Sequence, residues 1–278
     1  MMSRRIFLKN ISRTGAAIGA VGFSGFADEN DLSAEAGNAK GANVSATGSG
    51  EHGSSRNGQI KALAFDAYGT LFDVASVLSL CEELFPGKGS ALSQMWRIKQ
   101  LEYSWLRSLM GRYEDFADVT ESALVFSCNS LQLALSPANR GRLMDAYLHL
   151  KPFPEVAEAL KALSGYKCAI LSNGSPKMLE GVVRNAGLAD AFSDIISVEP
   201  VKIYKPSPHA YELGIKTLGV EKSAIGFISS NCWDAIGAKT FGFRTFWINR
   251  AGAPVDELGL QPDAKLKLLS ELPALLKS

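Results

Sequence analysis

The sequence predicts an α/β fold in which a doubly wound parallel sheet carries an inserted helical domain. Short apolar runs rich in branched residues alternate with helical stretches, as in parallel strands that are buried on both faces. About a hundred residues separate the first run from the second, too many for one crossover, so a separate piece must be inserted there. The runs are Ile60–Phe65, Lys167–Leu171, Asp194–Val198, Ala224–Ile228 and Arg244–Ile248.

Helices are expected between the later strands. Several of these stretches begin with Pro and end near Gly, the residues that favour the first turn of a helix and the position after its last turn. The expected helices are Pro154–Ser164, Pro176–Ala186, Pro208–Leu218 and Trp233–Phe241. The alternation predicts a Rossmann-like core made of residues 59–75 and 153–278.

The inserted piece, residues 76–152, is expected to be a helical cap. Its apolar residues recur three and four positions apart, which is typical of amphipathic helices. They include Leu92, Met95, Trp96, Tyr103, Leu106, Leu109 and Met110, and a second stretch runs from Thr120 to Leu135. We expect these stripes to pack mostly helix on helix.

Residues 1–27 are expected to be a signal peptide. Basic residues precede an apolar stretch, Thr14 to Ala27, that is shorter than the ~20 residues of a membrane span. The segment Ser3-Arg4-Arg5-Ile6-Phe7-Leu8-Lys9 resembles the twin-arginine export motif, which a receptor reads as an address. The resemblance implies recognition by the twin-arginine export machinery, cleavage after Ala27, and a periplasmic or secreted protein without a permanent membrane span.

Residues 28–58 are expected to form a flexible low-complexity linker. The segment is rich in Gly, Ser, Ala and Asn, and Leu32 and Val44 are its large aliphatic residues. Such a sequence buries too little apolar surface to offset the entropy lost on ordering.

The charge and cysteine content of the chain argue against several kinds of partner and site. The chain has 29 Lys and Arg against 28 Asp and Glu, a net charge of +1 without the basic field that nucleic-acid binding requires. Four cysteines are too few for a disulfide scaffold, and none forms a Cys-x-x-Cys pair for zinc or redox chemistry. We expect Cys81, Cys128, Cys168 and Cys232 to be buried small hydrophobic residues.

Candidate catalytic residues follow the carboxyl ends of the predicted strands. In an open parallel sheet, ligands bind beyond these ends, near the point where the strand order reverses. The first strand leads to Asp66, the second to Ser172 and Asn173, and the third to Lys205. The fourth leads to Asp234, so two carboxylates, a hydroxyl and a lysine converge at one edge.

These segments resemble the L-2-haloacid dehalogenases (type II) of the haloacid dehalogenase (HAD) superfamily, over essentially all of residues 59–278. In the cap, Ile98 replaces the glutamine that is common in that family. The matching segments are Phe65-Asp66-Ala67-Tyr68-Gly69-Thr70-Leu71, Ser172-Asn173-Gly174-Ser175, Ile203-Tyr204-Lys205-Pro206, Ser229-Ser230-Asn231-Cys232-Trp233-Asp234 and Trp96-Arg97-Ile98-Lys99-Gln100-Leu101-Glu102-Tyr103.

The magnesium-dependent phosphatases that make up most of the superfamily match less well. Their first loop carries a second aspartate that protonates the leaving alcohol, and here that position is Tyr68. Their fourth loop carries acids for Mg²⁺, whereas here Ser229, Ser230 and Asn231 precede Asp234, which leaves one acid too few. The resemblance implies neither a metal nor a cofactor.

The resemblance implies hydrolysis of small L-2-haloalkanoic acids to D-2-hydroxyalkanoic acids and halide through an ester on Asp66. Arg97 and Asn173 would receive the halide, whose developing charge needs donors but no proton. Ser172, with nearby backbone N–H groups, would hold the substrate carboxylate. Asp234 would orient or activate the water that attacks the ester.

Other matched positions are implied to support these groups. Lys205 and Thr70 would keep Asp66 oriented and ionised, since a neighbouring cation favours a carboxylate. Asp234 would be positioned by Lys205, Ser229 and Asn231, with Tyr211 in the same polar network. The residues implied to bind substrate are Tyr68, Arg97, Leu101, Phe116, Ser172, Asn173 and Trp233.

Three other functions remain open at this point. A related hydrolase could open a strained ring, as in L-azetidine-2-carboxylate hydrolysis, where the leaving amine needs a proton. A phosphatase would need Mg²⁺, and a non-catalytic protein would bind ligand without turnover. The resemblance also implies a homodimer, while the preferred halogen and chain length stay undetermined.

Overall fold

The computed structural model describes residues 59–277. The signal peptide expected at 1–27 and the linker expected at 28–58 lie outside the described residues. Within 59–277, every helix is too short or too polar to cross a membrane.

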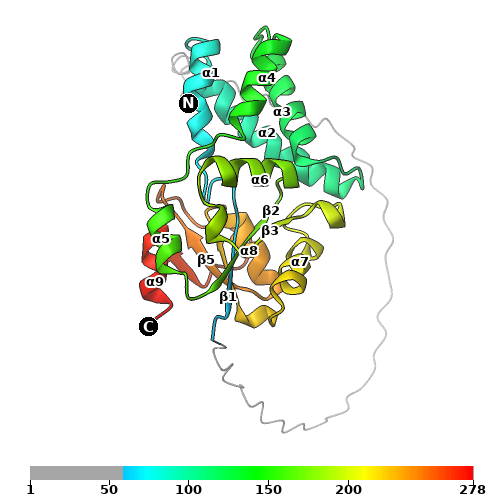
Figure 1. Cartoon of the computed structure of the whole chain (residues 1–278). Helices are drawn as coiled ribbons and strands as arrows, with labels where there is room; N and C mark the ends of the chain where they lie inside the picture. Colours follow the sequence, from blue (N-terminus) through cyan, green and yellow to red (C-terminus); the bar gives the residue numbers. More distant parts are fainter. Residues whose placement is uncertain (1–58, 278) are drawn as a thin grey trace, which may run out of the picture. The chain divides into compact units, whose positions relative to one another are not determined.

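A parallel sheet runs through the centre of the described part of the chain (Figure 1). Its order is β3-β2-β1-β4-β5-β6, with parallel pairing throughout. The strands are β1 (Ala62–Phe65), β2 (Lys167–Ser172), β3 (Asp194–Ser197), β4 (Ile225–Ser229), β5 (Arg244–Ile248) and β6 (Ala264–Leu266). The first described strand, β1, lies inside the sheet, and later strands are added first on one side and then on the other, which confirms the doubly wound fold. Strand β6 was not predicted, because its three residues are too few to show a pattern.

Helices cover both faces of the sheet, because neighbouring residues of each strand point to opposite sides. Leu63 and Phe65 belong to the core that α5, α6 and α9 complete, and Ala62 and Ala64 to the core under α7 and α8. These helices are α5 (Val156–Ala162), α6 (Pro176–Asn185), α7 (Pro208–Leu218), α8 (Cys232–Phe241) and α9 (Leu272–Leu275). Short 3₁₀ turns are η1 (Val74–Val77), η2 (Ala189–Ala191), η3 (Glu199–Val201), η4 (Lys222–Ala224) and η5 (Leu269–Glu271).

The helices between residues 78 and 146 form a cap at the top of Figure 1. Its long helices α2 and α3 pack against each other, with Trp96 and Val119 buried. Helix α3 begins where the side chain of Asp115 accepts from two backbone N–H groups. It ends at Ser130 rather than continuing to Leu135, and Gln132 takes a φ of 56°. The cap helices are α1 (Leu78–Leu84), α2 (Gly89–Leu109), α3 (Phe116–Ser130) and α4 (Pro137–Ala146).

Two chain segments connect the cap to the core, and these segments are hydrogen-bonded to each other. Asp73 N donates to Lys151 O at 2.8 Å, and Phe153 N donates to Leu71 O at 3.0 Å. We call residues 71–73 and 151–153 the hinge. Because its two segments are paired, the position of the cap is tied to the residues that directly follow β1.

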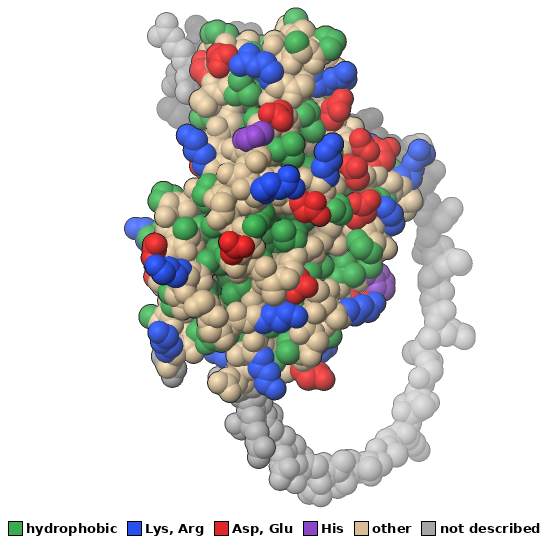
Figure 2. All heavy atoms as spheres, viewed as in Figure 1, with side chains coloured by type: hydrophobic (Ala, Val, Ile, Leu, Met, Phe, Trp, Pro, Cys, Tyr) green, Lys and Arg blue, Asp and Glu red, His purple; other side chains and the backbone are tan. Residues whose placement is uncertain are grey.

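The four cysteines are buried and free, as expected. Burial raises the pKa of Cys81, Cys128 and Cys168 to about 11, so these thiols stay protonated at neutral pH. Figure 2 shows basic and acidic side chains interspersed over the visible face of the molecule. That face therefore carries no extended field of one sign.

Candidate active site

The candidate site lies where the strand order reverses, beyond the carboxyl ends of β1 and β4. Asp66 directly follows β1, and its backbone N–H donates to Ile228 O of β4 at 2.9 Å. Main-chain pairing thus continues to the residue that carries the carboxylate. Its position is fixed by the sheet rather than by a free loop.

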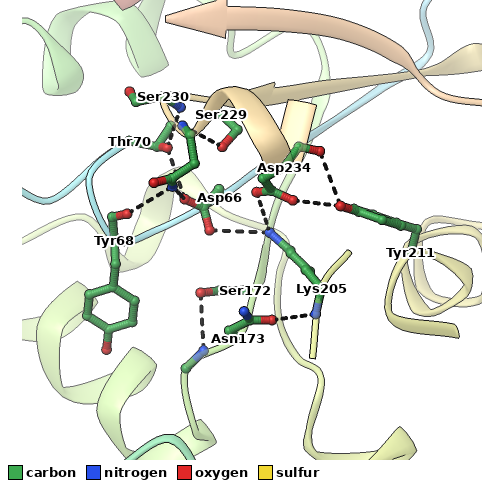
Figure 3. A network of polar contacts seen from close by, with 12 residues as sticks. Asp66, Tyr68, Thr70, Ser172, Asn173, Lys205, Tyr211, Ser229, Ser230 and Asp234 are labelled. Carbon is green, nitrogen blue, oxygen red and sulfur yellow. Dashed lines mark hydrogen bonds and ion pairs between the residues drawn. The ribbon is translucent and has the colours of Figure 1, made fainter. Parts of the chain in front are cut away.

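The Asp66 carboxylate accepts hydrogen bonds from three different segments (Figure 3). Its Oδ2 accepts from Thr70 Oγ1 at 3.0 Å and from Asn231 Nδ2 at 2.9 Å. Its Oδ1 lies 3.2 Å from Lys205 Nζ, and the side chain is 9% exposed. A buried charge is tolerated when it is paired and hydrogen-bonded, and these contacts supply both to the Asp66 side chain.

Lys205 joins Asp66 to a second carboxylate. Its Nζ lies 3.0 Å from Asp234 Oδ2, and Asp234 Oδ1 accepts from the Tyr211 hydroxyl at 2.8 Å. Burial raises the pKa of Asp234 to about 6; the charge of Lys205 opposes this rise and that of Asp66 adds to it. Burial, together with the Asp234 charge, also raises the pKa of Tyr211, which therefore stays a proton donor. Asp234 is thus a carboxylate whose pKa is close to neutral pH.

A tight turn after Asp66 brings Thr70 back beneath the carboxylate. Gly69 has a φ of +92°, a conformation that side chains disfavour, and its N–H donates to Phe72 O at 2.8 Å. The Thr70 hydroxyl donates to Asp66 and accepts from Ser230 N at 2.8 Å. Thr70 therefore connects the loop after β1 to the loop after β4.

The loop after β2 contributes Ser172 and Asn173. The Ser172 hydroxyl accepts from Gly174 N at 3.3 Å, and Asn173 Oδ1 accepts from Lys205 N at 2.9 Å. Gly174 is required by space, because a Cβ atom would lie 2.8 Å from the Tyr68 ring and from Leu179. These contacts orient the Ser172 hydroxyl and the Asn173 amide at the same edge of the sheet.

The cap supplies Arg97, from α2. Its Nη2 donates to Tyr68 O at 3.2 Å and approaches Asn231 Oδ1 at 3.5 Å. Its Nη1 donates to Gln100 Oε1 at 2.7 Å, and Gln100 Nε2 donates to Thr120 Oγ1 of α3 at 2.6 Å. A partly buried cation is thereby held directly over the loop that follows Asp66.

Aromatic side chains wall the site on the cap side. The Tyr68 ring packs 5.6 Å from Phe116 and 6.2 Å from Tyr147, measured between ring centroids. The Tyr68 hydroxyl is buried without a protein hydrogen-bond partner, and burial raises its pKa well above the usual value. Leu101 lies one turn beyond Arg97 on α2 and is partly buried.

An apolar cavity of about 460 Å³ adjoins Lys205 between α2 and α8. Trp233 and Trp105 both line it and pack against each other edge to face, with ring centroids 5.3 Å apart. Its other lining residues are Ser108, Leu109, Ile203, Tyr204, Pro206 and Ser207. The cavity, which we call the Trp chamber, can hold a small apolar group.

One sequence-based expectation needs correction. Ser229 and Asn231 were expected to position Asp234, but the Asn231 amide donates to Asp66 and to Tyr68 O at 3.3 Å. Asn231 meets Asp234 through the backbone, where Asp234 N donates to Asn231 O at 3.1 Å. The Ser229 hydroxyl accepts from Asn231 N at 3.1 Å and so orients Asn231 instead. The reason is that Asn231 precedes α8 and faces β1, whereas Asp234 lies inside the helix.

Sequence reasoning missed two residues that contact this site. Gln100 holds Arg97, and Arg250 donates to Thr70 O at 3.0 Å and to Ser230 Oγ at 2.8 Å. Arg250 follows the carboxyl end of β5, so the strand-end rule that selected Asp66 could have flagged it. Among residues 59–277, the structure has no cluster of three or more His, Cys, Asp and Glu side chains suited to a metal ion.

Comparison with known proteins places this geometry among hydrolases. The family model of haloacid dehalogenase-like hydrolases matches residues 60–242. An (S)-2-haloacid dehalogenase of Pseudomonas sp. (strain YL) is 55% identical over 206 residues, 73% of this chain and 89% of the relative. The haloacetate dehalogenase H-2 of Moraxella sp. (strain B) is 49% identical over 216 residues, covering 77% and 96% of the two chains.

A solved structure also matches. The L-2-haloacid dehalogenase of Xanthobacter autotrophicus, with chloropropionic acid covalently bound, superposes with a TM-score of 0.76 at 41% identity. The match covers 79% of this chain and 99% of that one.

Proposed function

This chain belongs to the haloacid dehalogenase-like hydrolases, and we propose that within this family it hydrolyses L-2-haloalkanoic acids to D-2-hydroxyalkanoic acids and halide. The observation that carries this function is the Asp66 carboxylate, which is held by Lys205, Thr70 and Asn231 and is followed by Tyr68 rather than by a second acid. Such a site offers a fixed nucleophile but lacks the second aspartate with which a phosphatase protonates its leaving alcohol.

In the first step, Asp66 attacks the α-carbon opposite the carbon–halogen bond, which forms an ester and releases halide. Halide is a weak base and leaves without a proton. Arg97, with Asn173, would stabilise its developing charge, since a guanidinium keeps its proton and offers several donors. Ser172, with nearby backbone N–H groups, would hold the substrate carboxylate.

In the second step, water attacks the ester carbonyl of Asp66, and Asp234 takes its proton. The bond between the carbonyl carbon and the substrate oxygen then breaks, and that oxygen receives the proton from Asp234 as the 2-hydroxy acid leaves. A base with a pKa of about 6 is ionised at neutral pH and still able to accept a proton. Lys205, which contacts both carboxylates, would stabilise the charge that develops on the carbonyl oxygen. Displacement at carbon occurs once, so the configuration at C2 inverts.

The decisive experiment is a single turnover in ¹⁸O water with excess enzyme. The ester route puts the label into the Asp66 carboxylate and leaves the first 2-hydroxy acid unlabelled. Mass spectrometry of the peptide that contains Asp66 reads this directly. Label in the hydroxy acid during the first turnover would instead mean that water attacks the substrate carbon.

Substrate class is tested by halide release from the two enantiomers of 2-chloropropionate in EDTA. We expect release from the L form alone. Two parallel assays cover the other functions: L-azetidine-2-carboxylate ring opening, and phosphate-ester hydrolysis with added Mg²⁺. Magnesium-dependent phosphate release without halide release would contradict the dehalogenase function, and so would activity confined to the strained ring.

We also propose that the chain is exported by the twin-arginine machinery and acts in the periplasm or outside the cell. The support is the segment from Ser3 to Lys9, which matches the export motif. Replacing Arg4 and Arg5 by Lys should retain the precursor in the cytoplasm in cell fractionation. Normal export of that variant would contradict the proposal.

A homodimer formed through the cap is proposed on the resemblance to the family. Helix α2 supports it, since Ile98 is 62% exposed and Leu109 is 85% exposed. Ile98→Asp should shift the protein to a monomer in sedimentation velocity, because a buried unpaired carboxylate opposes association. Lys88→Asp, just before the same helix, serves as a charge-changing control.

A further inference from the structure

Arg250 hydrogen-bonds to the loop that follows β1 and to the loop that follows β4. It lies just after β5, at the same edge of the sheet as Asp66. Its Nη1 donates to Ser230 Oγ at 2.8 Å and to Gly69 O at 3.3 Å. Its Nη2 donates to Thr70 O at 3.0 Å. The guanidinium therefore bridges the loop after β1 and the loop after β4.

The same guanidinium also reaches the chain that returns from the cap. Its Nη2 lies 2.7 Å from Glu155 Oε1, and its Nε donates to the same oxygen at 2.9 Å. Its central carbon lies 3.7 Å from the centroid of the Phe153 ring. Phe153 belongs to the hinge and Glu155 follows it. One side chain thus contacts the nucleophile loop, the fourth loop and the hinge.

The contacts of Arg250 converge on residues that hold the nucleophile. Thr70 donates to Asp66 Oδ2, and its hydroxyl accepts from Ser230 N. Arg250 binds the backbone of Thr70 and the side chain of Ser230. The two loops are therefore linked by Arg250 as well as by the Thr70 hydroxyl. The Arg250 and Glu155 side chains are 17% and 14% exposed, which makes their ion pair less screened than one at the surface.

The arrangement needs the shape of arginine. A planar guanidinium can donate to several acceptors at fixed angles and stack on an aromatic ring, whereas an ammonium is a compact point charge. Lysine at this position would keep the charge but lose the bridge. The change Arg250→Lys therefore alters the geometry of these contacts without changing the charge.

We propose that Arg250 is a positioning residue that couples the orientation of Asp66 to the hinge of the cap. It acts through Thr70 and Ser230 and has no part in proton or bond transfer. This inference rests on the proposed function, because the geometry it maintains is that of in-line attack. A displacement near 1 Å at a reacting group is enough to lower a rate by about 10²-fold.

The first test compares Arg250→Lys with Arg244→Lys, a matched change at the amino end of the same strand. We expect Arg250→Lys to lower kcat by about 10- to 100-fold while KM changes less than about threefold, since substrate contacts remain. Arg244→Lys should behave as wild type. Equal kcat values for the two variants would overturn the proposal.

Glu155→Gln tests the hinge arm separately. We expect a smaller loss of kcat, and the double variant Arg250→Lys/Glu155→Gln should lose less than the product of the single losses, because the two residues act as a unit. Arg250→Ala should regain activity when guanidinium is added at a non-denaturing concentration, and Arg244→Ala should not respond. Independent losses and no rescue would assign Arg250 a purely structural role.

Amide hydrogen exchange provides a readout that does not depend on turnover. In Arg250→Lys, exchange should become faster in residues 66–73 and 229–232 and in the hinge, with protection elsewhere unchanged. Unchanged exchange there would count against the proposal. If the wild-type protein released no halide from any 2-haloacid, the proposed function would fail, whereas this exchange pattern would still decide the role of Arg250.

Discussion

On the core side of the site, several loops surround the Asp66 carboxylate, whereas on the cap side α2 reaches across with the guanidinium of Arg97. The core groups are deeply buried, with side-chain exposures of 9% for Asp66, 1% for Lys205 and 0% for Asp234. Arg97 is partly buried, and it is held by Gln100 and by a backbone oxygen. The core thus holds buried charges that pair with one another, whereas the charge of Arg97 in the cap lies nearer to solvent.

This difference suggests how the work of the reaction is divided. The ester-forming and ester-hydrolysing groups must keep a fixed geometry, and they sit on loops anchored to neighbouring strands. Arg97, the group proposed to receive halide, sits on an element connected through the hinge. Removing a core charge leaves an uncompensated buried partner, while removing the cap charge mainly removes a stabilising donor.

The largest effect is expected from Asp66→Asn. An amide is a poor nucleophile, so halide release by freshly prepared protein should fall by about 10⁴-fold or more. Asp73→Asn is the matched control, because Asp73 caps η1 and Asn also caps helices well. Turnover by Asp66→Asn at even a tenth of the control rate would remove Asp66 from its role.

Lys205→Met should harm both activity and folding. It leaves Asp66 and Asp234 buried without their shared cation, which we expect to lower the free energy of unfolding by about 3–5 kcal/mol. The control is Lys202→Met, since Lys202 pairs with Glu199 at the surface and such pairs contribute about 0–1 kcal/mol. Urea titration of the two variants measures the difference. Equal stabilities would show that the buried Asp66 and Asp234 carboxylates do not depend on Lys205 for their stability.

For the cap, Arg97→Lys should lower kcat by about 10²- to 10³-fold, as expected when a donor to a developing anion is displaced. The fold should be unaffected. Arg107→Lys, on the same helix and paired with Glu114 at 2.8 Å, is the matched control. A bromide leaving group needs less stabilisation than chloride, so the loss should be smaller with 2-bromopropionate. The same loss with both halides would argue that Arg97 binds the carboxylate instead.

The pH dependence separates the two steps. Burial raises the pKa of Asp234 to about 6, and in the proposed mechanism its ionised form accepts the proton from water. Hydrolysis of the ester should therefore slow as pH falls through about 6. The ester should then accumulate, and quenched-flow mass spectrometry would detect it. Asp234→Asn should accumulate the ester at every pH. A decline that tracked ester formation rather than its hydrolysis would reassign the titrating group.

On the core side, the sequence could predict which residues meet at the site, but not how each of their side chains is oriented. Strand ends in a parallel sheet meet at one edge, so the positions of Asp66 and Lys205 followed from recognising the strands. The orientation of Asn231 toward Asp66 could not be predicted, because it depends on how α8 begins relative to β1. Strand β6 and the end of α3 at Ser130 carry too little local pattern to be recognised.

The cap side was harder to predict. Periodicity identifies a helix and its buried face, but it does not say which of its polar residues meets the core. Gln100 is spaced as a buried-face residue and yet is polar, which is a usable signal for a hydrogen-bonded partner. Arg250 was missed because it lies outside the segments that resemble the family, although it follows the carboxyl end of β5.

The smallest effect is expected at the Trp chamber, where cap and core meet. If the alkyl chain of the substrate extends past Lys205, Trp105→Leu should enlarge the space and favour longer 2-haloacids by about tenfold in kcat/KM, since one methylene in an apolar pocket is worth about 1–3 kcal/mol. Leu106→Ala, on the same helix but outside the chamber lining, is the control. Comparison of 2-chloropropionate with 2-chlorohexanoate measures the change. An unchanged ratio would place the alkyl chain against Tyr68 and Phe116 instead, and the cap would then set chain length through its aromatic wall.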